Sequence, residues 1–250
     1  MPTLFISDLH LSEKTPTLAH HFVKLLSDQA KQCESVYILG DLFEVWLGDD
    51  AITAQHQAIL AAIQQLTDNG SSVYFMHGNR DFLIGERFAA LTGCQLLAET
   101  SVIDLYGVAT LLIHGDQLCT DDLDYQAFRQ QVRNPLWQTQ FLKKTIEERI
   151  HLAQAARAES HKETSQKSDD IMDANHDAII NAFKTHHVNQ LIHGHTHRPN
   201  VHYYDINGKK TMRIVLGDWR SQASTLLVEP HHFTLNDERV QINSASLTEQ

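Results

Sequence analysis

Five short segments of the sequence place carboxylate, imidazole or amide side chains directly after an apolar run. The strongest is His193-Gly194-His195-Thr196-His197. Alternate residues of an extended chain face the same way, so His195 and His197 can reach one site, whereas a bend at Gly194 is expected to turn His193 away. Taken singly, the other four segments are also typical of turns, helix caps or buried histidines. They are Asp8-Leu9-His10, Gly40-Asp41, Gly78-Asn79-Arg80-Asp81 and His114-Gly115-Asp116.

Taken together, the five segments offer seven side chains with oxygen or imidazole donor atoms and no thiolate. Seven such donors are too many for one tetrahedral zinc ion, and they suit two metal ions that share a bridging carboxylate. Oxygen and imidazole donors favour Mn²⁺ or a similar first-row ion over a soft metal. The candidate ligands are Asp8, His10, Asp41, Asn79, His114, His195 and His197.

The apolar runs before these segments predict the strands that must position them. We expect strands over 3–7, 36–39, 72–76, 109–113 and 189–192, with helices over 18–26, 52–66 and 86–91 between the first of them. Alternating strands and helices imply parallel pairing through right-handed crossovers. In such sheets, ligand sites collect outside the carboxyl ends of the strands, which is where the candidate residues fall.

The pattern changes after residue 120. Apolar residues recur at helical spacing through 121–185, and no strand is expected there. Beyond it, runs at 201–205 and 212–216 flank Asn207-Gly208, a hairpin signal, and further strands are expected at 225–228, 233–235 and 239–242. We therefore predict a single α/β domain over residues 1–250. It contains two packed mixed β-sheets flanked by helices, an α/β/β/α sandwich, with a helical lid insertion at about 121–170.

The composition limits the classes of partner. The 250 residues include 20 Lys and Arg and 31 Asp and Glu, a net charge of -11, so nothing attracts the whole protein to nucleic acid. The apolar stretches are far shorter than the ~20 residues of a membrane span. The first residues lack the basic region of a signal peptide. Three cysteines without CxxC spacing argue against a disulfide framework, and we expect a reducing, cytoplasmic location.

The predicted insertion differs in charge from the rest of the chain. Four acidic residues accompany eight basic ones between 127 and 168, a net charge of +4. A basic, apolar-faced segment on an acidic protein suits peripheral binding to an anionic membrane surface. The alternative is a solvated helical hairpin whose apolar face packs on the core. The basic residues are Arg129, Arg133, Lys143, Lys144, Arg149, Arg157, Lys162 and Lys167.

The five segments, with their neighbours, resemble the calcineurin-like metallophosphoesterase superfamily. The motifs that carry the resemblance are SDLHLSE, LGDLFEVWLGDD, HGNRDFLIG, HGDQLCTDD and HGHTHRP. The extensions LFEVWLGDD and GNRDFLIG resemble one branch of it more closely, the UDP-2,3-diacylglucosamine hydrolases of lipid A biosynthesis. The resemblance covers roughly residues 1–220.

This resemblance implies a dinuclear manganese site and a particular reaction. Asp8, His10, Asp41 and His197 would hold one Mn²⁺; Asp41, Asn79, His114 and His195 would hold the other, with Asp41 bridging. Water would attack the α-phosphorus of a nucleotide-activated diacylated glucosamine lipid, releasing UMP and 2,3-diacylglucosamine 1-phosphate (lipid X). The enzyme would work on the cytoplasmic face of the inner membrane, and no required protein partner is evident.

The resemblance also implies residues that contact the substrate. Thr164 departs from the Asn that is frequent at this position in the family and keeps only a hydroxyl. Tyr125 is expected to stack near the nucleotide or glucosamine, or else to anchor the lid, and Arg157 is a weaker candidate. Asp81 and Asp116 are expected to orient metal ligands from behind. The expected substrate contacts are Asn79, Arg80, Asp122, Ser160, Thr164, Lys167 and His195.

Arg80 bears on the type of bond that is cleaved. Many members of the superfamily carry His at this position, and that His usually protonates the leaving oxygen. A leaving phosphate, with a second pKa of about 6, departs without an acid, whereas an alkoxide does not. Arg80 can instead pair with phosphate oxygens and spread the developing charge. We therefore expect cleavage of a pyrophosphate rather than of a simple phosphoester.

Two other functional classes remain open at this point. The same ligands would serve a phosphoesterase that acts on cyclic nucleotides, nucleic acid or phosphoproteins, but the acidic charge and the absence of a basic stripe with interleaved aromatic residues argue against nucleic acid. A non-catalytic scaffold of the same fold would have lost ligands, and all expected types are present here. Metal analysis of the purified protein separates a scaffold from an enzyme.

Overall fold

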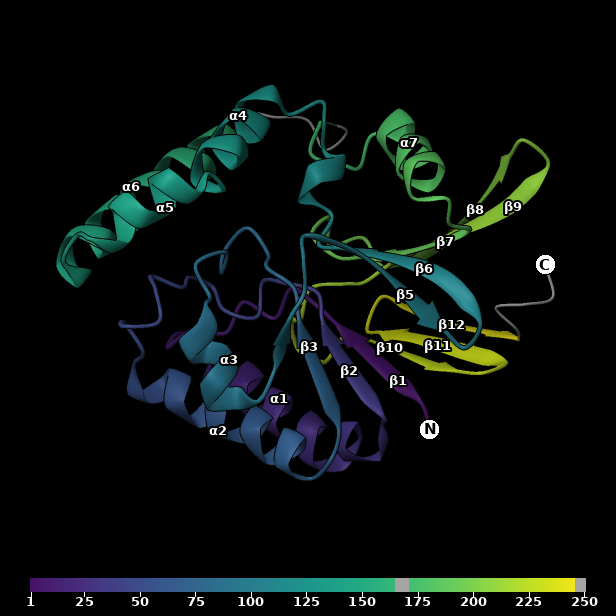
Figure 1. The fold of residues 1–250 in the computed structure, drawn as a ribbon, viewed down its shortest axis with the longest axis horizontal. Coiled ribbons are helices and arrows are strands. Elements are labelled where there is room, and N and C mark those ends of the chain that lie inside the picture. The colour runs from purple at the N-terminus through teal and green to yellow at the C-terminus, as the bar shows by residue number, and fades with distance from the viewer. Residues whose placement is uncertain (165–170, 246–250) are drawn as a thin grey trace.

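The computed structural model describes residues 1–164 and 171–245, and their strands form two β-sheets (Figure 1). The strands of the larger sheet are β1 (Thr3–Ile6), β2 (Ser35–Ile38), β3 (Ser72–Phe75), β4 (Gln95–Leu96), β10 (Thr225–Glu229), β11 (His232–Asp237) and β12 (Val240–Ala245). Their order is β12-β11-β10-β1-β2-β3-β4. β1 to β4 are parallel, and β10 pairs antiparallel with β1, so the sheet is mixed.

The second sheet has five strands, two from residues 100–113 and three from residues 190–215. They are β5 (Thr100–Leu105), β6 (Val108–Ile113), β7 (Gln190–His193), β8 (Asn200–Ile206) and β9 (Lys209–Val215). The order is β5-β6-β7-β9-β8, in which β6, β7 and β9 are parallel and the two edge strands antiparallel. Each sheet thus contains a run of neighbouring parallel strands, β1 to β4 in the larger sheet and β6, β7 and β9 in the smaller one, and the strands of each run end at a common edge.

Helices cover the outer faces of the two sheets. The helices are α1 (Pro16–Asp28), α2 (Ala54–Asp68), α3 (Glu86–Thr92), α4 (Leu123–Val132), α5 (Pro135–Leu142), α6 (Ile146–Thr164) and α7 (His176–His186), with 3₁₀ turns η1 (Ala30–Gln32) and η2 (Asp116–Leu118). In Figure 1, α1, α2 and α3 lie along the larger sheet and α7 lies along the smaller one.

The side-chain alternation of the strands produces the layers. In β1, Leu4 and Ile6 pack with the apolar faces of α1, α2 and α3, whereas Phe5 points the other way. Phe5 joins Leu112 of β6 in the core between the sheets, and Leu111 packs against α7. Because successive strand residues face opposite sides, both sheets are buried on both faces. The predicted α/β/β/α architecture is confirmed.

Most predicted elements are confirmed with shifts of a few residues at their ends. The Asn207-Gly208 hairpin forms between β8 and β9, and both turn residues have positive φ, 57° and 77°, as a two-residue turn requires. Two strands were not predicted, β4 and β5. β4 has only two residues, and β5 is a half-exposed edge strand whose TSVIDL sequence has no continuous apolar run.

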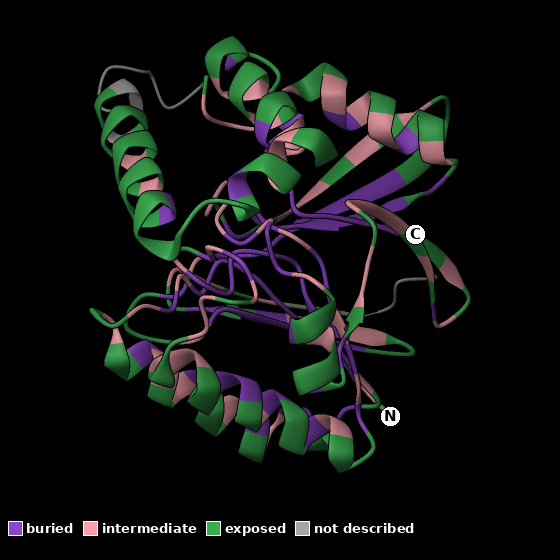
Figure 2. Cartoon of the chain, turned by 60° about the vertical axis from the view of Figure 1, so that its left-hand side comes forward, coloured by how far each residue is buried: buried purple, intermediate pink, exposed green. Residues whose placement is uncertain are grey.

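The segment α4–α6 extends beyond the loops that follow the parallel strands (Figure 1). Figure 2 shows that much of its surface is exposed. It is fixed to the rest of the protein by Phe141, which joins the main core, and by the almost fully buried Arg149, which donates to Leu47 O at 2.6 Å and to Asp50 Oδ1 at 2.7 Å. Within the described residues, the helices include none that is long and apolar enough to cross a membrane.

Candidate metal centre and adjoining pocket

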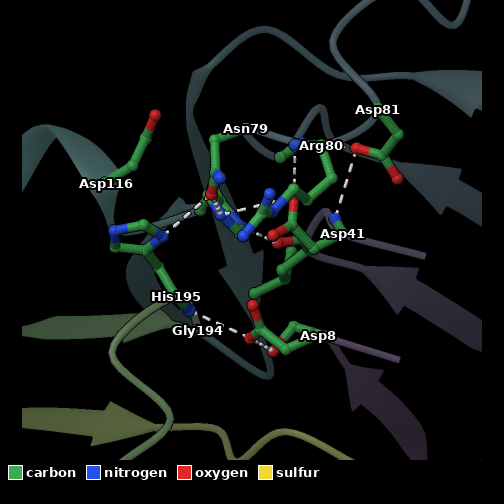
Figure 3. Close-up of polar contacts among 12 residues, drawn as sticks. Asp8, Asp41, Asn79, Arg80, Asp81, Asp116, Gly194 and His195 are labelled. Atoms are coloured by element: carbon green, nitrogen blue, oxygen red, sulfur yellow. Dashed lines mark hydrogen bonds and ion pairs between the residues drawn. The ribbon is translucent and has the colours of Figure 1, made fainter. Parts of the chain in front are cut away.

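The loops after β1, β2, β3, β6 and β7 meet at one place (Figure 3). Backbone hydrogen bonds join them: Asp8 N donates to Gly40 O at 3.0 Å, and His10 N donates to Asp41 O at 3.0 Å. From the second sheet, His195 N donates to Asp8 Oδ2 at 2.9 Å. The five predicted segments therefore form a single site between the two sheets.

One group of donor atoms comes from the loops after β1 and β7. Asp8, His10 and His197 each offer an atom, and these atoms lie within 4.8 Å of one another. Nε2 of His197 lies 3.4 Å from Asp8 Oδ1 and 3.3 Å from Nε2 of His10. Two imidazole nitrogens and a carboxylate oxygen thus face a common point.

A second group lies beside the first. Oδ1 of Asn79 is 3.0 Å from Nε2 of His114 and 2.9 Å from Nδ1 of His195. His114 donates its Nδ1 proton to Leu39 O at 2.8 Å, so its Nε2 carries the free lone pair. Asp41 stands between the groups, with Oδ1 3.8 Å from His114 Nε2 and Oδ2 3.9 Å from His10 Nε2. All seven predicted ligands lie in this centre.

Five of these residues have a strained backbone. Asp8, His10, Asp41, His195 and His197 have φ between 50° and 67°. The left-handed region is uncommon for residues other than glycine, and such residues collect at functional sites, where the surrounding structure holds them. The centre therefore combines the donor set of a metal site with the backbone strain expected of one.

Two glycines of the motifs are required by the close approach of the loops. A Cβ on Gly78 would lie 2.1 Å from Asp41 Oδ1, and a Cβ on Gly194 would lie 2.2 Å from Asp8 Oδ2. Any other residue would displace a candidate ligand. These two glycines are therefore explained by lack of space for a side chain rather than by turn geometry alone.

The charges of the centre fit a cation. Burial by itself would raise the pKa of Asp8, but the contact with His197 and the positive charges of His114 and His10 outweigh it and lower that pKa. Burial, followed by the charge of His114, lowers the pKa of His195 to about 4. Asp8 Oδ1 is buried and accepts no hydrogen bond of good geometry among the described residues. A buried carboxylate oxygen that lacks a hydrogen bond of good geometry and lies beside imidazole nitrogens suits a divalent metal ion.

His193 is separate from these donors, in agreement with the expectation that it is no ligand. It is fully buried, and its Nδ1 lies 2.8 Å from Gly194 O, which fixes the proton on that nitrogen. Burial and the nearby Arg213 lower its pKa to about 3. His193 is thus a neutral imidazole of the core.

Asp81 and Asp116 lie behind the ligands in different ways. Burial and the charge of Asp41 raise the pKa of Asp81 to about 7. Its carboxyl group accepts from the backbone N–H of Gly78 at 2.9 Å and of Leu42 at 2.8 Å, and so ties the loops after β2 and β3 together. Asp116 instead accepts a hydrogen bond of 2.7 Å from Nε of Arg129, a residue of α4. Asp81 therefore shapes the ligand loops, and Asp116 fastens α4 to the site.

A pocket of about 690 Å³ adjoins the centre and extends beneath α4, α5 and α6. Asn79 and Arg80 form its inner end. Arg80 Nε is buried and has no hydrogen-bond partner among the described residues, although its backbone N–H donates to Asp41 Oδ1 at 2.8 Å. The pocket walls are largely apolar and include Trp46, Leu47, Phe82, Leu83, Phe128, Val132, Trp137, Phe141 and Leu152.

The predicted substrate residues fall partly in this pocket. Asp122, Tyr125, Arg157 and Ser160 line it. Tyr125 lies flat on the ring of His195, with centroids 5.8 Å apart, and its hydroxyl donates to Asp116 Oδ2 at 2.9 Å. Its position is compatible with both roles expected for it, and the contact with Asp116 favours the anchor. Thr164 ends α6 with a side chain that is not described, and Lys167 lies outside the described residues.

The basic charge of the insertion points largely inward. Arg129 and Arg133 pair with Glu99, Arg149 pairs with Asp50, and Arg157 pairs with Glu44. Those side chains fix α4 and α6 to the rest of the protein and add little positive surface. Apolar side chains of α4–α6 that do not line the pocket are exposed instead: Leu123, Leu136, Leu142, Ile146 and Ile150.

Two residues near the centre were missed by sequence reasoning. Asp218 follows β9, and its Oδ2 lies 3.8 Å from Nδ1 of His197. The sequence pattern could have identified Asp218, because Gly217-Asp218 directly follows an apolar run, as Gly40-Asp41 does. Arg239 donates to His197 O at 3.0 Å and to Asp218 Oδ1 at 2.6 Å. No sequence pattern marks Arg239, which reaches the site from the loop before β12.

Arg239→Met is expected to lower the free energy of unfolding by about 2–4 kcal/mol. The change removes the arginine partner of the buried Asp237, one of the two arginine partners of Asp218, and the donor to the His197 carbonyl. Arg220→Met is the matched control. Arg220 is 54% exposed and makes one contact with Asp218, so a loss under about 1 kcal/mol is expected. Urea unfolding measures both. Equal losses for the two variants would contradict the assigned role of Arg239.

Comparison with known proteins places the chain in a family. A model of the calcineurin-like phosphoesterases matches residues 1–199. The chain belongs to the calcineurin-like phosphoesterase family. This phosphoesterase is 49% identical to a Klebsiella pneumoniae protein over 230 residues, 92% of the chain and 96% of the relative. It is also 47% identical to a Salmonella typhi protein, over 94% of the chain and 98% of that relative. The identity to an Escherichia coli protein is again 47%, over 91% of the chain and 95% of that relative. All three are named UDP-2,3-diacylglucosamine hydrolase.

These findings confirm the predicted superfamily, its hydrolase branch and the α/β/β/α phosphoesterase fold. The phosphoesterase family is metal-dependent, and the Asp and His cluster agrees with that property. The roles of the individual ligands, the identity of the metal and the extent of the lid stay predictions.

Proposed function

We propose that this phosphoesterase hydrolyses the diphosphate bond of UDP-2,3-diacylglucosamine in lipid A biosynthesis. The products would be UMP and 2,3-diacylglucosamine 1-phosphate (lipid X). The observation that carries the proposal is the meeting of a seven-residue donor centre with a long apolar pocket, with Arg80 at their junction. The 47–49% identity to named hydrolases over nearly the whole chain supports the same substrate.

The donor set supports a pair of Mn²⁺ ions. Asp8, His10, Asp41 and His197 would hold one ion, and Asp41, Asn79, His114 and His195 the other. When bound, two such ions lower the pKa of water and neutralise phosphoryl oxygens. The protein contributes the fixed positions: backbone bonds between the loops and the left-handed residues orient every donor before substrate arrives.

Arg80 is proposed to bind the diphosphate. Its buried Nε needs an acceptor, and its guanidinium can form paired hydrogen bonds with phosphate oxygens. Attack at the α-phosphorus leaves the sugar phosphate as the departing group. That group can leave without being protonated, because the second pKa of a phosphate is about 6. Arg80 can therefore stabilise the negative charge of the leaving phosphate, in the position where other members of the superfamily carry a general acid.

The pocket supports the lipid part of the substrate. Its apolar walls can shield acyl chains from water, at roughly 0.8 kcal/mol per buried methylene. Asp122, Arg157 and Ser160 lie among these walls and are proposed to contact the sugar and phosphate, with Thr164 and Lys167 as further candidates. We propose that 121–170 is the lid of one domain that covers 1–250.

Isotope labelling tests the bond that is cleaved. Turnover of UDP-2,3-diacylglucosamine in ¹⁸O-labelled water should place the label in UMP, because the α-phosphorus accepts the water oxygen. Mass spectrometry of both products reads the result. Label in the sugar phosphate would show attack at the β-phosphorus instead and would overturn the proposed reaction.

We further propose peripheral binding to the cytoplasmic face of the inner membrane through the outer surface of α4–α6. Leu136 is 74% exposed and Ile146 41% exposed, so Leu136→Asp with Ile146→Asp should lower binding to anionic liposomes about tenfold or more. Reversing the exposed charges of Lys143 and Lys144 should weaken it further, by about 1 kcal/mol per residue. Sedimentation with liposomes measures both; unchanged binding would favour a solvated hairpin.

A further inference from the structure

Glu44 lies between a candidate metal ligand and the helix that covers the pocket. Its Oε2 is 3.1 Å from Nδ1 of His10, whose other ring nitrogen faces His197. Its other carboxylate oxygen forms an ion pair with Arg157 of α6, and its carbonyl accepts Arg157 Nη1 at 3.2 Å. One carboxylate therefore touches both groups.

The backbone fixes Glu44 in this place. Its N–H donates to Leu11 O at 3.0 Å, and Leu11 pairs with Phe43 as a short parallel bridge. Leu11 directly follows His10, so the segment that carries Glu44 is bound to the segment that carries the ligand. The Glu44 side chain is about one quarter exposed and also lines the pocket.

We propose that Glu44 is a positioning residue that joins the metal centre to α6. His10 Nδ1 is buried and makes no hydrogen bond of good geometry among the described residues, and Glu44 Oε2 lies 3.1 Å from it. A small rotation of either side chain would let the carboxylate accept the Nδ1 proton, which would fix the tautomer that leaves Nε2 free and hold the ring toward the centre. Arg157 holds the carboxylate from the opposite side. Glu44 thus couples two features of the protein: the packing of α6 over the pocket through Arg157, and the orientation of the His10 ring. This inference rests on the proposed metal site.

Mn²⁺ titration of the metal-free, full-length protein by calorimetry tests the inference without turnover. Glu44→Ala should weaken one of the two Mn²⁺ sites about 10–100-fold. Glu44→Gln keeps an oxygen that can accept from Nδ1 and should recover most of that affinity. Glu229→Ala is the control, because Glu229 is exposed at the end of β10 that lies opposite the site. Thermal unfolding verifies that each variant folds.

A double-mutant cycle tests the connection to α6. Arg157→Met alone should lower the Mn²⁺ affinity of the same site about fivefold. In a protein that already carries Glu44→Ala, adding Arg157→Met should lower that affinity no further. Wild-type affinity in Glu44→Ala, or equal effects of Arg157→Met in both backgrounds, would overturn the inference. His10→Asn separates the two proposals: if it binds both ions as wild type does, the metal site itself is wrong.

Discussion

Asp41→Asn is expected to lower kcat at least about 10³-fold. Asp41 is buried between the two donor groups, within 4 Å of both His10 and His114. Loss of an outer hydrogen-bond partner of a metal site typically costs 10–100-fold, and the loss of a shared charged ligand should exceed that range. The amide keeps the size of the side chain, so the effect reports charge and ligation rather than packing.

Metal-induced stabilisation provides a second measurement for Asp41→Asn. Mn²⁺ at about 100 times its Kd should stabilise the wild-type protein by about 2.7 kcal/mol, a rise in Tm of roughly 5–10 °C. The variant should lose most of that rise. Its metal-free Tm should not fall, because the neutral amide removes the repulsion that raises the pKa of Asp81.

The matched control is Asp68→Asn, an exposed residue at the end of α2. It should leave kcat and the Mn²⁺-induced rise in Tm at wild-type values. Near-wild-type activity of Asp41→Asn with two bound Mn²⁺ ions would contradict the proposed bridge.

Arg80→Ala is expected to lower kcat/KM for UDP-2,3-diacylglucosamine about 10²–10³-fold, the loss that follows removal of one donor to a developing negative charge. Arg80 stands where the pocket meets the metal centre, and its buried Nε has no partner among the described residues. The interaction expected to be lost is therefore the proposed one with phosphate oxygens of the substrate. Arg87→Ala, an exposed arginine on α3, is the control and should remain near wild type.

Arg80→His tests the nature of the bond that is cleaved. An imidazole can protonate an alkoxide leaving group, which Arg80 cannot. The ratio of the rate on alkyl phosphoesters to the rate on the UDP-lipid should therefore be higher for the variant than for the wild type. Rates on both substrates for wild type and variant give the preference. A wild-type protein that prefers the alkyl ester would contradict the argument for a pyrophosphate.

The sequence was sufficient for the fold and for the members of the donor centre. Strand positions follow from short apolar runs, and parallel strands must end at one edge of a sheet, so Asp8, Asp41 and Asn79 were expected together before any coordinates. The second sheet brings His114 and His195 to the same edge because β6 and β7 are also parallel. The short strand β4 and the half-exposed edge strand β5 escaped detection, since neither has a continuous apolar pattern.

The insertion shows where sequence reasoning reaches its limit. Eight basic residues suggested a positive outer surface, but charge counts do not state direction. In the structure Arg129, Arg149 and Arg157 turn inward to carboxylates on other segments of the chain, and apolar side chains remain exposed. The residues of each pair meet only because the helices pack on those loops, and no local sequence pattern shows that they do.

The sequence by itself determined the layered α/β/β/α fold, the phosphoesterase family and the donor types, because alternation, strand ends and short motifs are local properties of the chain. Tertiary structure alone decided that Asp41 stands between the two donor groups, that Glu44 connects His10 to Arg157, and that Arg239 supports His197. Those contacts depend on how two sheets and a helical segment pack, and packing distances are not encoded in any local pattern.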